Sequence, residues 1–211
     1  MIDSNLIALF TVATFVLMIT PGTDMVYVMS NALSSGKKAG VVSILGVASG
    51  AYIHVILATL GVAAIVSASP TLYKILVLAG ALYMGWIGWG IFTHHAMISS
   101  LDKRPARTLK KIYMQGVMTN LLNPKAIIFT LSFFPQFISH EMGRVSEQML
   151  LLGVILVIIM VLVELPLVFF ASAIGECLSK SERLSKRVHQ FSGATLIALA
   201  LYITTTRLVM H

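Results

Sequence analysis

The stretch Ile19-Thr20-Pro21-Gly22-Thr23-Asp24 interrupts an apolar run that extends from about Asn5 to Leu33. A run of that length can cross a lipid bilayer as a helix. Pro21 removes a backbone donor, Gly22 permits an irregular turn, and Thr23 or Asp24 is expected to cap a restarted helix. The sequence therefore predicts a membrane-spanning helix that is broken along its length and carries a carboxylate at the break.

A second interruption of the same kind, Asn120-Leu121-Leu122-Asn123-Pro124-Lys125, lies in a later apolar segment. Asn before Pro is a natural helix start, because Pro is tolerated at the first helical position. Paired breaks in corresponding apolar segments indicate a transport site. We therefore expect the two breaks to meet deep between the helices.

The composition is that of a membrane protein. Of 211 residues, 57% are hydrophobic and only 11% are charged, and several apolar runs are long enough to span a bilayer. The net charge of +7 does not indicate nucleic-acid binding, because the basic residues gather in short loops between the apolar runs. We expect a single transmembrane domain over residues 1–211.

Six apolar spans are expected, at about residues 5–33, 39–67, 72–93, 114–138, 149–177 and 191–209. The loops after the first, third and fifth spans hold most of the basic residues, which places both termini outside the cytoplasm. If the broken first segment re-enters without crossing, the N-terminus is instead cytoplasmic and the spans number five.

Three spans in each half imply halves of opposite orientation, as in many transporters. Pro21 in the first span is followed by Ala79-Gly80-Ala81 in the third, and Pro124 in the fourth by Ser192-Gly193-Ala194 in the sixth. The predicted fold is an all-α membrane protein with six transmembrane helices, built as a 3+3 inverted repeat with broken first and fourth helices.

Ionisable residues inside apolar spans are functional candidates, because charge in hydrocarbon is costly. Asp24 and Lys125 each lie at a helix break, where irregular backbone must face protein or water. Lys125 and the free amides of a helix N-terminus suit a substrate carboxylate, and Asp24 suits an ammonium group. The two breaks together fit a small amino acid. A structural Asp24–Lys125 salt bridge and a plain kink at Pro21 are the alternatives.

Three residues are candidates for proton coupling, namely Asp24, Glu164 and His54. Glu164 precedes Pro166 by two residues, so it is either a proton carrier or a neutral acid bonded to the carbonyl of Leu162 that the proline frees. His54 shares a helical face with Val47, Gly50, Ala58 and Gly61, which favours a packing role over a proton relay.

Tyr27 and Asn31 follow Asp24 on one helical face and are predicted to line the pathway. The residues predicted to contact substrate are Pro21, Gly22, Thr23, Asp24, Tyr27, Asn31, Asn120, Asn123, Pro124 and Lys125.

Other motifs have structural interpretations. The GxxxG at Gly46 and Gly50 predicts a close helix contact, and Trp86 and Trp89 an interfacial belt. The neighbouring His94 and His95 make a poor metal site without a further ligand. No enzymatic or phosphate-loop motif occurs, so no cofactor or metal is predicted.

Four stretches carry a resemblance to a known family, namely Pro-Gly-Thr-Asp at 21–24, Ser-Ser-Gly-Lys-Lys-Ala-Gly at 34–40, Asn-Leu-Leu-Asn-Pro-Lys-Ala at 120–126 and Phe-Phe-Pro-Gln-Phe at 133–137. In these stretches the chain resembles the LysE-type amino-acid exporter family, and within it the RhtB branch. In that family the first motif usually reads Pro-Gly-Pro, and Thr23 departs from it. The resemblance implies proton-driven export of amino acids across a bacterial inner membrane.

The sequence therefore predicts a multi-pass secondary exporter of small neutral amino acids or derivatives, with substrate, protons and the lipid bilayer as partners. It does not fix the cargo, the proton stoichiometry or whether the protein forms a homo-oligomer. A passive channel or a non-transporting membrane subunit is the alternative, and a membrane-embedded enzyme is disfavoured because no nucleophile–base pair or metal set is recognisable.

Overall fold

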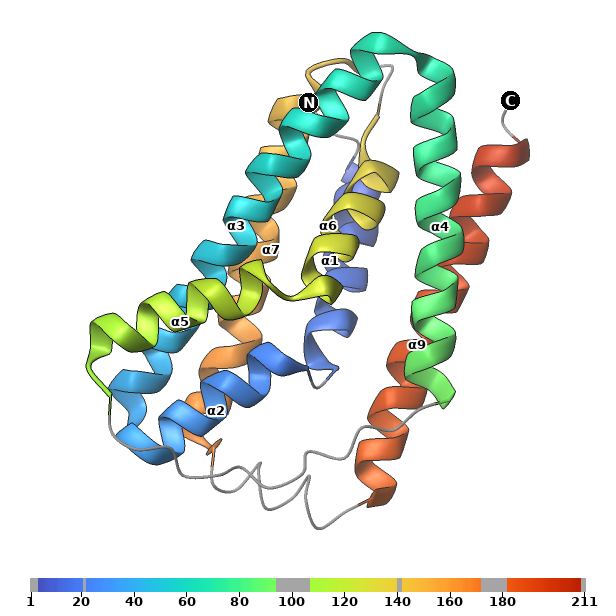
Figure 1. Ribbon diagram of the computed structural model, residues 1–211. Coiled ribbons are helices and arrows are strands. Elements are labelled where there is room, and N and C mark those ends of the chain that lie inside the picture. Colours follow the sequence, from blue (N-terminus) through green and yellow to red (C-terminus); the bar gives the residue numbers. More distant parts are fainter. Residues whose placement is uncertain (1–3, 21, 94–106, 140–141, 172–181, 210–211) are drawn as a thin grey trace.

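The computed structural model describes residues 4–20, 22–93, 107–139, 142–171 and 182–209, and this part of the chain is helical without strands (Figure 1). The elements are α1 (Ser4–Ile19), α2 (Thr23–Ser35), α3 (Lys37–Ala68), α4 (Pro70–Thr93), α5 (Leu109–Leu121), α6 (Pro124–Phe133), the 3₁₀ helix η1 (Phe134–Phe137), α7 (Val145–Phe169) and α9 (Glu182–Val209). The prediction of an all-α membrane protein is confirmed at this level.

Three helices of the described chain, α3, α4 and α7, are long and apolar enough to cross a membrane. Together α1 and α2 form a fourth such stretch, bent by 56° at their junction. The second predicted break is also present, since α5 ends at Leu121 and α6 begins at Pro124. α5 is the more polar half of its pair because it contains Lys110, Lys111 and Gln115.

The capping expected at the first break needs correction. Gly22, with extended backbone, is the N-cap of α2, and no side chain caps the helix; Thr23 and Asp24 already belong to its first turn. Pro21 lies outside the described residues. At the second break the Asn123 carbonyl accepts from the Ile127 amide at 3.1 Å, so α6 starts where the Asn-Pro pair predicted.

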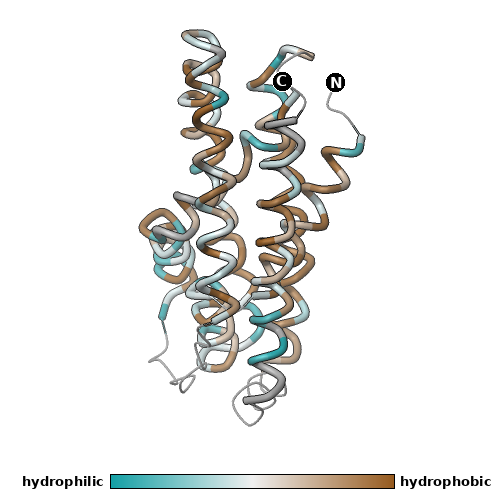
Figure 2. The backbone as a smooth tube through the Cα atoms, turned by 90° about the vertical axis from the view of Figure 1, so that its right-hand side faces the viewer, coloured by the Kyte–Doolittle hydropathy of each residue, from teal (hydrophilic) through white to brown (hydrophobic). Residues whose placement is uncertain are grey.

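Figures 1 and 2 show the helices running between two ends of the molecule. The start of α1, the last turns of α9 and the α3–α4 turn share one end, here called the outer end. The α2–α3 turn, where Lys37 and Lys38 are exposed, lies at the opposite, inner end. α1 and α6 occupy the outer half, whereas α2 and α5 lie obliquely in the inner half (Figure 1).

Small residues set the closest helix contacts, as the GxxxG motif predicted. A Cβ at Gly46 would overlap the Tyr113 carbonyl oxygen of α5, and one at Gly50 would lie 2.8 Å from the Val117 carbonyl oxygen. Gly61, expected on the same packed face, is exposed instead, with nothing near it. The close α3–α5 contact therefore stops short of Gly61.

The outer end is closed by aromatic side chains. Phe10 of α1 packs on Phe133, Phe134 and Phe137 with ring centroids 5.1–5.5 Å apart, and all four are essentially inaccessible to solvent. The Tyr73 hydroxyl of α4 donates to the Pro135 carbonyl at 2.8 Å. The Phe-Phe-Pro-Gln-Phe motif is thus a buried plug between α1 and α4; we call Phe10, Phe129, Phe133, Phe134 and Phe137 the aromatic cluster.

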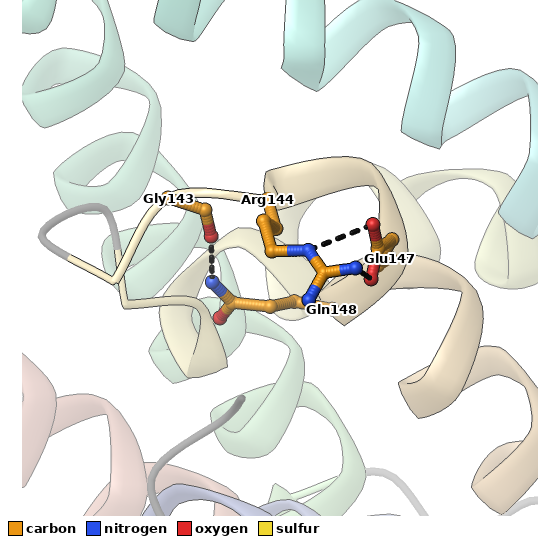
Figure 3. A network of polar contacts seen from close by, with 4 residues as sticks. All are labelled: Gly143, Arg144, Glu147 and Gln148. Carbon is orange, nitrogen blue, oxygen red and sulfur yellow. Dashed lines mark hydrogen bonds and ion pairs between the residues drawn. The ribbon is translucent and has the colours of Figure 1, made fainter.

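A polar network fastens the segment after η1 to the start of α7 (Figure 3). The Gln148 side chain donates to the Ser139 and Gly143 carbonyls, and its oxygen accepts from the Ser139 amide at 2.9 Å. Arg144 adopts a left-handed backbone (φ 53°) and pairs with Glu147 at 2.7 Å. Because that ion pair is exposed, the buried Gln148 contributes more to the fastening.

Large apolar side chains are exposed along the long helices, among them Leu60, Leu82 and Trp86 at 67–69% of their surface. A water-soluble protein rarely shows so much contiguous apolar surface. Exposure of this kind fits a lipid environment. Trp86 and Trp89 are exposed in the last two turns of α4, consistent with the predicted interfacial belt.

Candidate functional site

The two helix breaks meet. The Asn120 amide nitrogen donates to the Asp24 carboxylate at 2.9 Å, across 96 residues of sequence. The Asn123 amide donates to the Thr23 hydroxyl at 3.1 Å and lies 3.4 Å from the same carboxylate. Asparagines of the second break therefore hold the carboxylate of the first, and a charge that would be costly alone has hydrogen-bond donors.

A pocket of about 70 Å³ lies at this meeting point, enough for a few water molecules or a small polar group. The polar residues in its lining are Thr20, Thr23, Asp24, Asn120, Asn123, Thr130 and Glu164. They come from α2, α5, α6 and α7 and from the two breaks, where Thr20 and Asn123 lie. The wall is completed by apolar residues, including Leu17, Phe129 and Met160.

Helix termini add to the electrostatics of the pocket. α2 and α6 both begin at it, and the first amides of α2 receive no side-chain cap. Uncapped amides and the positive end of a helix dipole favour an anion. The pocket thus presents a carboxylate, Asp24, beside two helix N-termini, an arrangement that suits a molecule carrying both charges.

Glu164 of α7 lines the same pocket. Its side chain is only 4% exposed, and its Oε2 atom has no hydrogen-bond partner among the described residues. Glu164 and Asp24 line the same pocket from different helices. The described contacts contain no bond from Glu164 to the Leu162 carbonyl, and the choice between proton carrier and neutral acid stays a prediction.

Tyr27 and Asn31, predicted to line the pathway, are buried away from the pocket lining. The Tyr27 hydroxyl donates to the Ile112 carbonyl of α5 at 2.6 Å, and the Asn31 amide to the Tyr27 carbonyl at 2.9 Å. These bonds join α2 to α5 and stabilise α2 itself. Substrate contact by either residue stays a prediction.

His54 of α3 is buried, and its Nε2 atom lies 3.1 Å from the Asn120 carbonyl oxygen. Because a carbonyl oxygen can only accept, Nε2 is the donor in this contact. His54 thus supports the backbone just before the second break rather than lining the pocket.

Several predicted residues lie outside the described part of the structure. These are Pro21, the side chains of Pro124 and Lys125, and the pair His94 and His95. The predicted role of Lys125 therefore rests on sequence alone. The structure adds Thr130 and Met160, which the sequence analysis missed. The available signal was helical spacing, since Met160 lies four residues before Glu164 and Thr130 seven after Asn123.

Comparison with known proteins identifies the family. The model of the LysE type translocator family matches residues 15–207. The chain belongs to the LysE type translocator family. An uncharacterized membrane protein of Bacillus subtilis, YrhP, is 30% identical over 206 residues, which cover 93% of this chain and 97% of the relative.

Two further relatives have informative names. A leucine efflux protein of Enterobacter sp. is 28% identical, with 90% of this chain and 91% of the relative covered. A threonine efflux protein of Escherichia coli is 26% identical, with 91% and 94% covered. No solved structure matches the chain significantly.

These names agree with the RhtB branch expected from the motifs. Membership of the LysE type translocator family points to a transporter rather than an enzyme, and to a multi-pass protein of a bacterial inner membrane.

Proposed function

We propose that the protein is a secondary active exporter of small neutral amino acids or their derivatives from the bacterial cytoplasm, coupled to protons. The observation that carries the proposal is the pocket in which Asp24 and Glu164 face the meeting helix breaks. Efflux of amino acids by the leucine and threonine relatives supports the cargo class.

In this mechanism the substrate enters as a zwitterion. Asp24 binds the ammonium group, and Lys125 with the free amides at the start of α6 binds the carboxylate. The amides of Asn120 and Asn123 keep the Asp24 carboxylate oriented. If Asp24 and Lys125 form an ion pair in the empty transporter, the substrate breaks that pair. Its ammonium group then pairs with Asp24 and its carboxylate with Lys125.

Alternating access is proposed to arise from two inverted halves of one transmembrane domain, with six passes in all. The α1–α2 and α5–α6 pairs each cross as a broken helix. The small-residue motifs support this, because Gly80 of α4 lies against the Ser132 carbonyl of α6, and the Ser192 hydroxyl of α9 donates to the Val16 carbonyl of α1. Each motif packs on the broken helix of the other half.

The state seen here is proposed to face inward, with both termini outside the cytoplasm. The aromatic cluster lies between the pocket and the outer end, as α6 runs outward from the pocket to η1 (Figure 1). The exposed Lys37 and Lys38 at the inner end support a cytoplasmic position for that end. Release of substrate then requires the aromatic cluster to open.

The first test concerns Asp24. In proteoliposomes, Asp24→Asn is expected to lower amino-acid counterflow at least about 30-fold, because a buried charged contact to the substrate contributes about 2 kcal/mol or more. Glu147→Gln, which neutralises an exposed carboxylate at the outer end, is the matched control and should transport normally. Full counterflow by Asp24→Asn would remove the site assignment.

A second test concerns proton coupling through Glu164, whose Oε2 atom has no hydrogen-bond partner in the described part of the chain. We expect Glu164→Gln to retain substrate exchange but to lose uphill efflux driven by a pH gradient. The measurement combines labelled substrate flux with a pH-sensitive dye inside the vesicles. Uphill flux that persists in the variant would exclude Glu164 as the carrier, and purely downhill flux in the wild type would favour a channel.

A further inference from the structure

A second, smaller cavity adjoins the substrate pocket. It measures about 20 Å³ and exposes only apolar surface. Its lining comes from α1, α4, α6 and α9, with the residues Leu17, Tyr83, Met84, Ile87, Phe129, Ser132, Phe133 and Leu196. The hydroxyl groups of Tyr83 and Ser132 are therefore turned away from the space, although both residues border it.

Leu17 and Phe129 line both cavities. Leu17 belongs to α1 and Phe129 to α6, two helices that meet mainly through side chains such as Phe10 and Phe133. The two cavities thus share two apolar lining residues, and this pair is the partition to which the proposal below refers.

We propose that the apolar cavity is the subsite for the side chain of the transported amino acid, and that it selects aliphatic side chains. The inference rests on the proposed function, in which Asp24 and the helix N-termini hold the ammonium and carboxylate groups. The side chain of a substrate held there passes between α1 and α6, displaces Leu17 or Phe129 from the partition, and occupies the space beside Ile87.

Size and polarity of the cavity determine the selection. A space of about 20 Å³ admits one or two methyl-sized groups before the lining has to move. An apolar wall leaves a substrate hydroxyl without a hydrogen-bond partner and excludes a charged side chain more strongly. Leucine, isoleucine and valine are therefore preferred over threonine and homoserine, and lysine and arginine are rejected.

Ile87 is the residue to change, because it borders this cavity but not the polar pocket. Shortening it in Ile87→Ala enlarges the subsite, and lengthening it in Ile87→Phe fills it. Ile91, one turn along the same helix, is partly buried in the same core and lines neither cavity. Ile91→Ala is therefore the matched control.

The experiment measures counterflow in proteoliposomes with leucine, valine, methionine, threonine and lysine as competing substrates. Ile87→Ala is expected to raise the ratio of methionine to valine transport about tenfold, and Ile87→Phe to lower it by a similar factor, since one methylene in an apolar pocket changes discrimination by 10-fold or more. Ile91→Ala should leave the ratio unchanged.

The outcomes separate the two proposals. A wild type that transports none of these amino acids overturns the proposed function. A wild type that transports them, with preference for threonine or lysine or with ratios that Ile87 variants leave unchanged, overturns the side-chain subsite alone. A shift produced equally by Ile91→Ala also overturns it, because the effect would then come from general loosening of α4.

Discussion

At the scale of single residues, the site depends on amide groups that hold a carboxylate. The side-chain amide of Asn120 donates to the Asp24 carboxylate. The backbone carbonyl oxygen of Asn120 lies 3.1 Å from His54 Nε2 and accepts from the backbone N–H of Asn123 at 3.0 Å. The second break is therefore fastened to α3 and to the first break through one residue. Loss of the Asp24 carboxylate would therefore remove a hydrogen bond from the residue that also contacts Asn123 and His54.

A substitution of Tyr27 distinguishes two roles for this residue, contact with the substrate along the pathway and a hydrogen bond that joins α2 to α5. Tyr27→Phe removes the hydroxyl that donates to the Ile112 carbonyl, so the free energy of unfolding should fall by about 1 kcal/mol in detergent micelles. Transport measured on the folded variant should stay close to wild type. A transport loss above tenfold with unchanged stability would instead support the predicted contact with substrate.

At the scale of elements, helix breaks and glycine contacts define the bundle. The breaks arise from local chemistry, because Pro and Gly disfavour a continuous helix wherever they stand. The glycine contacts depend on which helix faces the glycine. Gly46 meets the backbone of α5, whereas Gly61 on the same helix meets nothing.

That contrast gives a prediction with an internal control. Gly46→Ala places a methyl group against the Tyr113 carbonyl and should destabilise the protein by about 1–3 kcal/mol. Gly61→Ala, which adds the same methyl group in open space, should be neutral or stabilise α3 by up to about 1 kcal/mol. Equilibrium unfolding of both variants in micelles measures the difference, and equal effects would contradict the α3–α5 contact.

At the scale of the whole molecule, the two ends differ. The outer end is held by the aromatic cluster, the Tyr73 hydroxyl and the Gln148 network. Among the described helices, α4 packs on α9, α6, α3 and η1, and α9 packs on α4 and α1. Both make at most marginal contact with α2, α5 and α7. Among the described residues, the marginal contact of α4 and α9 with α2, α5 and α7 fits the inward-facing state proposed above.

The side of the membrane from which the pocket can be reached tests the inward-facing state. Thr23 is exposed and lines the pocket, so the Thr23→Cys variant in a Cys177→Ser background should react with a membrane-impermeant maleimide in inverted vesicles but not in intact spheroplasts. Ser67→Cys, exposed near the outer end of α3, should show the opposite sidedness. Reaction of the Thr23→Cys variant from the outside would contradict an inward-facing state.

The sequence by itself determined the helical membrane class, both breaks and the close contact at Gly46 and Gly50. These follow from hydropathy and from the backbone chemistry of Pro, Gly and Asn, which act within a few residues of the chain. The predicted N-cap of α2, Thr23 or Asp24, was wrong, since Gly22 is the N-cap. The choice among these three neighbours depends on the backbone conformation of a single turn, which the sequence pattern does not resolve.

Only the tertiary structure decided which polar groups share the pocket. Tyr27 follows Asp24 by one helical turn yet is turned to α5, while Glu164, 140 residues further along the chain than Asp24, faces it. The apolar cavity beside Ile87 was likewise invisible in the sequence. The physical reason is that the packing of helices distant in sequence selects which face of each helix meets the space between them, and helical periodicity alone leaves that choice open.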